Sequence, residues 1–375
     1  MSRDTDIMIA GGYGTVGRRV AADLAPDYPD RVVVAGRSDE RAAHLAAELG
    51  HGVRARRVDV GDPDSVGSAL EGVGLVISCI DQPEPHLLRA AIARGLAYTD
   101  VAPHLMTRRP TEAIKAEATR SGARIVLGSG LAPGISSLLA RLGADRVGAV
   151  EKVEVGVLLS VGDAYGPASR AYLLEELSLP YAVWTEGREV PARPFGGYAR
   201  VLFPPHLGRR KAYLFPFSDQ VFFPDTLGAR TALSRLALEP PWLGALLSVL
   251  LRLRATAMLG RRAGAEERVR RLNAWLRRRY EGRDWYGIVV EVEGARGRVR
   301  ASLVGRGQAE GTAIGAAAVV RGLAEGGVKQ PGIWLAEEVV PPEPFFEYLA
   351  AHGLVPTVEA TPEDSRLVGH GKRGR

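Results

Sequence analysis

Short blocks of apolar residues recur through the first 130 residues, and a stretch with helical spacing follows each block. Four blocks, DIMIA, RVVVA, LVISCI and ARIVLG, are apolar at nearly every position rather than at every second position. Such continuous strands are typical of a parallel sheet that helices bury on both faces. Because crossovers between parallel strands are right-handed, the alternation predicts a doubly wound α/β fold.

The second half of the chain follows another pattern. From residue 145 onward several segments alternate apolar and polar positions, which predicts a mostly antiparallel sheet with one face in solvent. A helical stretch at 241–281 interrupts these strands, a helix rich in small residues is expected at 311–327, and a last short helix follows. This half therefore predicts a second domain of the α+β type.

A run of glycines joins the first expected strand to the first expected helix. The sequence GGYGTVG holds Gly12, Gly14 and Gly17 in the spacing G-x-G-x-x-G, between a strand and a helix. This is the context in which such a turn binds the pyrophosphate of a dinucleotide at the amino end of the helix. The residues expected to bind the cofactor here are Gly11, Gly12, Gly14, Thr15, Val16 and Gly17.

The end of the second strand indicates which dinucleotide is bound. An NAD-binding protein places an acid about 20 residues beyond the glycines, on the ribose hydroxyls. Here Arg37 and Ser38 occupy that place, and Arg41 follows one helical turn later. A guanidinium binds phosphate through two N–H donors, so we expect NADP rather than NAD. Further cofactor contacts are expected from residues at the ends of the third and fourth strands, namely Asp59, Val60, Cys79 and Ile80.

These features together predict an N-terminal Rossmann domain, a doubly wound parallel sheet, followed by the α+β domain. The Rossmann domain is expected at 1–135. The α+β domain, for substrate and dimerisation, is expected at 136–330 with its helical insertion at 241–281. Residues 331–358 are expected to fold back on the Rossmann domain, and 361–375 to form a flexible tail.

Composition narrows the function classes. The chain of 375 residues has a formal net charge of +6 and a single cysteine, Cys79, so it forms no disulfide within itself and no cysteine-rich zinc site. No interleaved aromatic and basic motif indicates nucleic-acid binding. The N-terminus lacks the apolar core of a signal peptide, and the apolar run at 242–251 is about half the length that spans a bilayer. We therefore expect a cytoplasmic protein.

The candidate catalytic residues follow from what the chain lacks and from where its strands end. No tyrosine has a lysine four residues later, and no HExxH, GxSxG or P-loop motif is present. Ligands of open α/β sheets bind beyond the carboxyl ends of the strands. The side chains expected to donate a proton there are Asp100, His104 and Tyr165. Each residue also has a structural interpretation: Asp100 as a cap of the next segment, His104 as a surface loop histidine, and Tyr165 as a side chain that packs on the cofactor.

The order and spacing of GGYGTVGRRVAADLA, VVVAGRSDERAAHLAAEL, VDVGDPDSVGSALEGVGLVISCI, AYTDVA and GLAPGISSLLA resemble the saccharopine dehydrogenase-like family. These motifs cover roughly residues 6–140. The resemblance implies an NAD(P)-dependent oxidoreductase with a Rossmann domain and an α+β domain that also dimerises. The insertion at 241–281 departs from the family's lysine-pathway members, which argues against an amino-acid substrate.

The resulting hypothesis is an NADP-dependent reductase that transfers hydride to a C=N, C=C or C=O bond of a small, fairly apolar molecule or lipid. One alternative is a saccharopine-type reductase of an amino-acid imine, and another is a non-catalytic NADP-binding sensor or scaffold. A homodimer is expected. The insertion is interpreted as a dimer or lid helix, in preference to an interfacial helix that contacts a membrane or an acyl substrate.

Overall fold

The structure is a computed structural model. It describes residues 5–82, 84–101, 111–163, 176–177, 181–253, 271, 274–276 and 278–360. The chain divides into two compact units, and the first is built from two separate stretches, Met1–Leu138 and Ala309–His352. The second unit comprises Leu139–Gln308 and Gly353–Arg375.

The first unit contains a seven-stranded sheet in which each described pair of neighbours is parallel. Its order, β15-β6-β5-β4-β1-β2-β3, reverses direction between β1 and β4, as in a doubly wound fold. The strands are β1 (Asp6–Ala10), β2 (Val32–Gly36), β3 (Arg54–Arg57), β4 (Val73–Ser78), β5 (Ala97–Asp100), β6 (Arg124–Leu127) and β15 (Gly332–Leu335). Every residue of β1 and β2 is buried, which confirms the parallel-sheet prediction from their continuous apolar sequences.

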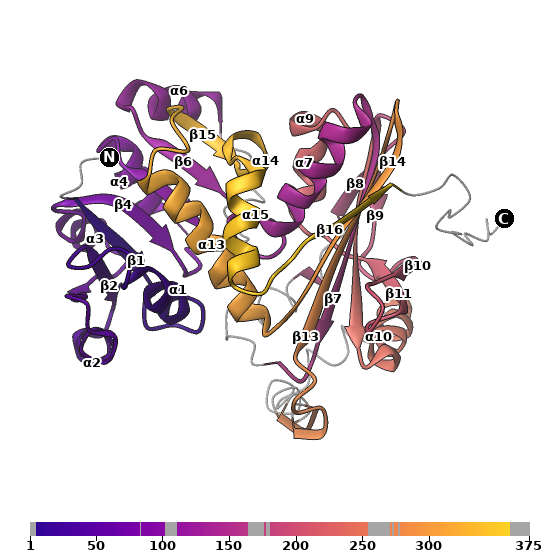
Figure 1. The fold of residues 1–375 in the computed structure, drawn as a ribbon, viewed down its shortest axis with the longest axis horizontal. Coiled ribbons are helices and arrows are strands. Elements are labelled where there is room, and N and C mark those ends of the chain that lie inside the picture. The colour runs from indigo at the N-terminus through magenta and orange to yellow at the C-terminus, as the bar shows by residue number, and fades with distance from the viewer. Residues whose placement is uncertain are drawn as a thin grey trace. The chain divides into compact units, whose positions relative to one another are not determined.

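Helices connect these strands and cover the sheet. In the N-terminal stretch they are α1 (Gly17–Leu24), α2 (Asp39–Leu49), α3 (Pro63–Ala69), α4 (His86–Ala93) and α6 (Glu112–Ser121). The helix α7 (Ile135–Val147) begins in the first unit and ends in the second. The C-terminal stretch adds α13 (Gln308–Ala324), α14 (Ala336–Val339) and α15 (Pro342–Ala351), whose orange and yellow ribbons lie beside the indigo and purple elements of the first unit (Figure 1).

The helix α13 corrects one expected boundary. The sequence assigned residues up to 330 to the second domain, whereas all of α13 after Gln308 belongs to the first unit. Its polar residues explain this, because Glu310 pairs with Arg19 of α1 at 2.8 Å and Arg321 pairs with Asp27. Its small residues Ala316 and Ala317 are fully buried, so the helix can pack closely against its neighbours.

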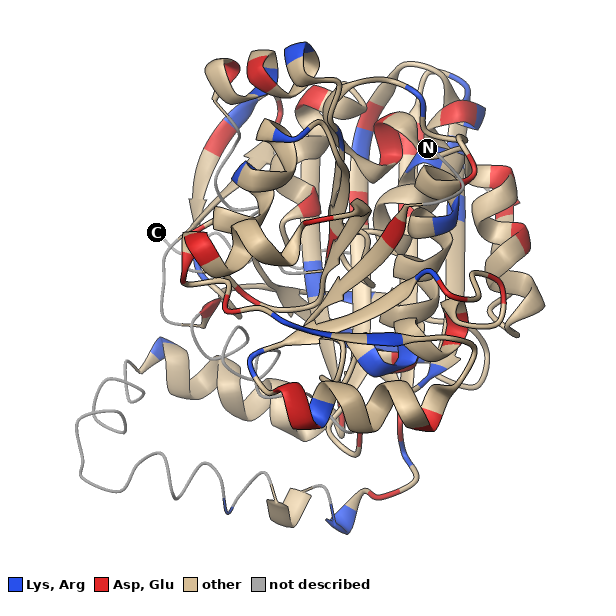
Figure 2. Ribbon diagram, turned by 90° about the vertical axis from the view of Figure 1, so that its left-hand side faces the viewer, with Lys and Arg blue, Asp and Glu red and all other residues tan. Residues whose placement is uncertain are grey.

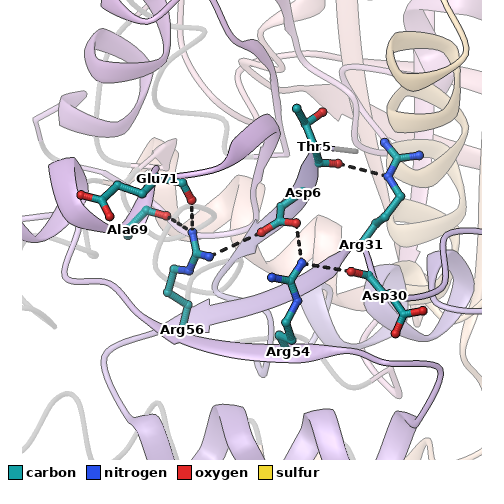
Figure 3. Close-up of polar contacts among 8 residues, drawn as sticks. All are labelled: Thr5, Asp6, Asp30, Arg31, Arg54, Arg56, Ala69 and Glu71. Atoms are coloured by element: carbon teal, nitrogen blue, oxygen red, sulfur yellow. Dashed lines mark hydrogen bonds and ion pairs between the residues drawn. The ribbon is translucent and has the colours of Figure 1, made fainter. Parts of the chain in front are cut away.

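An ion-pair cluster holds the edge strand β3 to the rest of the first sheet (Figure 3). Arg54 and Arg56 of β3 both pair with Asp6 at the start of β1. Arg56 also donates hydrogen bonds of 2.8 Å to the carbonyls of Ala69, the last residue of α3 (Pro63–Ala69), and of Glu71 just beyond it. The charged residues of β3 thus anchor it, and they also keep its edge from pairing with another chain.

The second unit contains a nine-stranded sheet with the main order β10-β11-β12-β7-β13-β14-β16, while β8 pairs with β12 and β9. Among the described strand pairs of this second sheet, only β7–β12 is parallel, so the sheet is mixed and mostly antiparallel as expected. The strands are β7 (Val150–Ser160), β8 (Tyr181–Thr185), β9 (Arg188–Ala192), β10 (Tyr198–Leu202), β11 (Arg209–Leu214), β12 (Thr231–Glu239), β13 (Trp285–Gly294), β14 (Gly297–Arg306) and β16 (Thr357–Ala360).

Two further helices of the second unit are α9 (Asp219–Thr226) and α10 (Pro241–Arg252). The expected helical insertion at 241–281 begins with α10, but residues 254–270 lie outside the described part of the chain. Among the described residues, no helix combines the length and the apolar character needed to cross a membrane.

Candidate dinucleotide-binding and active site

The glycine turn between β1 and α1 is packed too tightly to accept side chains. A Cβ on Gly17 would lie 2.3 Å from the carbonyl oxygen of Gly11, and one on Gly12 would lie 2.8 Å from the Val34 side chain. Gly11 has φ +77°, a conformation that L-residues with side chains rarely adopt. These glycines therefore bring the start of α1 against the ends of β1 and β2, which is the role that a dinucleotide turn requires of them.

The first turn of α1 presents amides suited to an anion. In the described part of the chain, the N–H groups of Thr15, Val16 and Gly17 have no backbone acceptor. The N-cap residue Val16 makes no side-chain capping bond, and the first turn contains no acid. Free amides and the positive end of the helix dipole favour a phosphate at this place.

Tyr13, which stands between Gly12 and Gly14 in the glycine turn, covers the end of β2. Its ring lies where a side chain on Gly36 would be, because a Cβ there would come within 2.5 Å of it. Its hydroxyl accepts a hydrogen bond of 3.0 Å from the Ser38 amide, and the Arg41 guanidinium lies 4.4 Å from its ring centre. Tyr13 thus links the glycine turn to the Arg37–Arg41 segment, a connection that the sequence alone did not indicate.

The segment after β2 has the chemistry expected for a 2′-phosphate. Arg37 is exposed, and no acid stands at the strand end. Ser38 caps α2, its hydroxyl oxygen accepting a hydrogen bond of 3.3 Å from the Arg41 amide. Shortly after β3, Asp59 makes two hydrogen bonds within its own loop. Its carboxylate accepts the Gly61 amide at 3.0 Å, and its own amide donates to the Ser65 hydroxyl. Val60 adjoins it and is half-buried.

Asp100 lies at the carboxyl edge of the same sheet, beyond the point where the strand order reverses. It is the last residue of β5, pairs in register with Ser78 of β4, and is fully buried. One oxygen, Oδ1, accepts a hydrogen bond of 3.2 Å from the Gly128 amide. The other, Oδ2, is buried and has no hydrogen-bond partner among the described residues. The Tyr98 hydroxyl influences this carboxyl, but it makes no hydrogen bond of ordinary geometry to Oδ2. A buried polar atom without such a partner is costly, so its place calls for a functional explanation.

The surroundings of Asp100 alter its protonation. Burial raises the pKa of its carboxyl to about 7, although the Gly128 amide and the Tyr98 hydroxyl act to lower it. The Tyr98 hydroxyl accepts a hydrogen bond of 3.3 Å from Gln82, which also donates to Ser78 at 3.0 Å. This network could not be predicted from the sequence, because Gln82 lies in a loop and Tyr98 is indistinguishable from a core residue in the strand pattern.

Cys79 and Ile80 follow β4 at the same edge. The Gly11 position lies against both, since a Cβ there would come within 2.7 Å of Ile80 and 3.4 Å of the Cys79 carbonyl group. Burial, with the Asp100 charge as a second cause, raises the pKa of the Cys79 thiol to about 12. Cys79 is therefore a protonated thiol at neutral pH, which agrees with its interpretation as a wall residue rather than a nucleophile.

The structure brings together part of the predicted site. The glycine turn, Cys79 and Asp100 share the carboxyl edge of one sheet. The other two expected proton donors, His104 and Tyr165, lie outside the described residues. Within the described ranges, no group of three or more His, Cys, Asp or Glu residues could hold a metal ion.

Comparisons with known proteins agree with this geometry. Residues 7–126 match the family described as "Saccharopine dehydrogenase NADP binding domain". The fold is similar to that of apo saccharopine dehydrogenase (L-Glu forming) from Saccharomyces cerevisiae, with 17% identity, a TM-score of 0.66, and coverage of 96% of this chain and 100% of that one.

More limited likenesses cover about a third of this chain. Pen from Bacillus thuringiensis is 17% identical over 33% of this chain and 49% of its own, with a TM-score of 0.27. Serine dehydrogenase from Escherichia coli is 12% identical over 32% of this chain and 80% of its own, with a TM-score of 0.26. The glycine turn, the arginine after β2 and the matched segment together identify residues 7–126 as an NADP-binding domain of the saccharopine dehydrogenase type.

Proposed function

We propose that this oxidoreductase is a reductase that delivers hydride to a C=N, C=C or C=O bond of a small, fairly apolar molecule or lipid, with Asp100 supplying the proton. NADPH, when bound, provides the hydride. The observation that carries the proposal is the Asp100 carboxyl, which is fully buried, leaves Oδ2 unpartnered and has its pKa raised to about 7. A carboxyl that stays protonated near neutral pH can act as a general acid.

The chain's own residues divide the work of binding between two ends of the cofactor. The amides of Thr15, Val16 and Gly17 are suited to hold the pyrophosphate. The 2′-phosphate is expected to bind to Arg37, Ser38 and Arg41. Tyr13 holds two of these residues in place, because its hydroxyl accepts the Ser38 amide and its ring contacts the Arg41 guanidinium. Asp59 and Val60 would border the adenine, and Cys79 and Ile80 the nicotinamide side.

Asp100 is suited to its task by its neighbours. The Gly128 amide fixes Oδ1, so that Oδ2 remains to hold or release a proton. The Asp100 carbonyl accepts bonds of 2.8 and 2.7 Å from the Ser129 amide and hydroxyl, which hold the backbone at this position. His104 and Tyr165 stay candidate donors from the sequence.

The hypothesis is tested by following NADPH absorbance with a panel of imines, enones and aldehydes of increasing apolar length. We expect turnover with at least one class, and we expect kcat to fall as the pH rises above about 7, because Asp100 then loses its proton. Asp100→Asn should abolish turnover while leaving NADPH affinity unchanged. NADPH binding without turnover on any class would contradict the reductase and support the sensor.

Cofactor choice is tested separately at Arg37. Arg37→Ala should weaken NADPH binding by about 10- to 100-fold and leave NADH binding unchanged, because only the phosphate contact is lost. Arg120→Ala, which removes an exposed arginine at the end of α6, is the matched control and should change neither affinity. Equal losses for both coenzymes in Arg37→Ala would contradict the assignment. Isothermal titration calorimetry gives both constants.

A further inference from the structure

The helix α10 of the second unit differs from an ordinary surface helix in the residues that it buries fully. Its buried positions are the small residues Gly244 and Ser248, four residues apart. A Cβ on Gly244 would come within 2.9 Å of the Tyr213 ring, and the Ser248 hydroxyl donates a hydrogen bond of 3.0 Å to the Phe195 carbonyl. The helix therefore attaches to the sheet through its small side chains.

Several large apolar residues on one side of α10 point to solvent, while Leu243, Leu247, Leu250 and Leu251 are half-buried. Trp242, Leu246, Val249 and the cap residue Leu253 are 44%, 44%, 53% and 72% exposed, respectively. Their spacing of four, three and four residues places them on one side of the helix, which we call the α10 face. From Pro241 to Leu251 the helix has no charged residue, so its ribbon is tan over this range in Figure 2. An apolar stripe of this kind marks an interaction surface.

The surface beside the α10 face is aromatic and basic. The exposed side of the β10–β11 hairpin carries Tyr198, Leu202 and Lys211, and the Lys211 ammonium lies 5.0 Å from the Tyr198 ring centre. Tyr198 packs in turn against Tyr213, which contacts α10. The outward neighbours on the two strands are Arg200 and Arg209, and neither strand contains an acid.

A second aromatic group lies at the amino end of α10. The Trp242 indole donates a hydrogen bond of 3.1 Å to the Tyr280 hydroxyl, and two arginines, Arg279 and Arg283, lie within 5.6 Å of the Tyr280 ring centre. Arg252 stands in the last turn of α10, and the described residues 278–284 hold three arginines against two acids, Glu281 and Asp284. The described rim of the α10 face therefore carries a net positive charge.

We propose that the α10 face docks on an anionic lipid surface. Tryptophan, tyrosine and leucine on one side of a helix, with arginines at its border, are the residues that insert at the boundary between headgroups and acyl chains. At 12 residues the helix is about 18 Å long, so it lies in the interface and does not span the bilayer. A second copy of this chain would bring like charges together around the stripe, which disfavours it as the occupant.

The test is flotation of the full chain with vesicles, without cofactor. We expect binding to vesicles of equal parts phosphatidylcholine and phosphatidylglycerol, weak binding to phosphatidylcholine alone, and a decrease when salt is added. The variant Leu246→Glu/Val249→Glu changes two exposed positions and should lose binding about tenfold or more. Val355→Glu, at another exposed apolar residue that is 64% accessible, is the matched control and should bind as the parent protein does.

Several results would overturn the proposal. Absence of flotation with both lipids would do so, as would an equal loss in the Val355→Glu control. Light scattering provides a third: a dimer of the parent protein that dissociates in the Leu246→Glu/Val249→Glu variant would assign the α10 face to a second copy instead. Melting followed by circular dichroism verifies that the second unit of each variant is folded, and NADPH affinity verifies the first unit.

Discussion

Replacing Asp100 by asparagine should stabilise the protein, and more so at high pH. Burial raises the pKa of this carboxyl from 3.8 in the unfolded chain to about 7 in the folded one. Between these values the unfolded state has lost its proton and the native state has kept it, so native stability falls as the pH rises through this window. The loss ends near pH 7, and asparagine, which is neutral, does not incur it.

The size of the effect follows from the same two values. The shift of roughly three pKa units corresponds to at most about 4 kcal/mol, of which about 3 kcal/mol falls between pH 5 and pH 8. For a unit of this size, 1 kcal/mol moves the melting temperature by about 2–4 °C. Asp100→Asn should therefore gain about 6–12 °C over the parent protein at pH 8, relative to the difference at pH 5.

Scanning calorimetry at pH 5 and pH 8 measures this difference. Glu112→Gln is the control, because it removes a carboxylate whose side chain is 89% exposed in the same unit, and it should give the same shift at both pH values. Cys79 offers a second readout: the loss of the Asp100 charge lowers its pKa, so iodoacetamide should modify this sole cysteine faster in Asp100→Asn. A stability gain that is equal at both pH values, or larger at pH 5, would refute the reasoning.

Two further changes test the packing of the first unit. Gly17→Ala places a methyl group 2.3 Å from the Gly11 carbonyl oxygen and should abolish NADPH binding in calorimetric titration, whereas Gly67→Ala, with its nearest neighbour at 3.9 Å, should leave binding intact and stability equal or higher by up to about 1 kcal/mol. Asp6→Ala removes the carboxylate that both arginines of β3 share and should cost about 1–2 kcal/mol in urea unfolding; a loss no greater than the roughly 0.5 kcal/mol expected for the exposed Glu112→Ala would contradict a role for the cluster.

The elements that sequence patterns predicted are those whose signals are local. The continuous apolar segments predicted β1, β2, β4 and β6. Asp62 followed by Pro63 is a further local signal, since Asp62 caps α3 by accepting the Asp64 amide. The glycine spacing predicted the tight turn before α1. These signals depend on a few adjacent residues, so tertiary contacts had little scope to override them.

The elements that were missed depend on distant partners. β15 has only four residues, directly follows Pro331 and begins at Gly332, so its sequence resembles a loop. It becomes a strand by pairing with β6, roughly two hundred residues earlier in the chain. The β8–β9 hairpin had a signal that could have been used: Glu186 and Gly187 both have positive φ in a two-residue turn, but the pair Glu-Gly is a weaker indicator than Asn-Gly.

The candidate site divides in the same way. The glycine turn and Arg37 could be assigned from spacing, because one strand and one helix fix their positions. The network of Tyr98, Gln82 and Asp100 could not, because it depends on side chains from different elements meeting under the sheet edge. The orphaned Oδ2 of Asp100 is a property of its packing and has no signature in the letters around it.

The first unit is assembled from two stretches of the chain that are separated by residues 139–308, and this constrains the order in which its parts become available. The ribosome releases α13 and β15 only after residues 139–308 have been synthesised. During that interval β6 is an edge strand without its partner β15. A fragment that ends at residue 138 would keep that edge and lose the helix that buries its flank. Truncated proteins that contain only the N-terminal stretch should thus aggregate through this edge. A protein inserted between the two stretches of the first unit should be tolerated, because both stretches are still present.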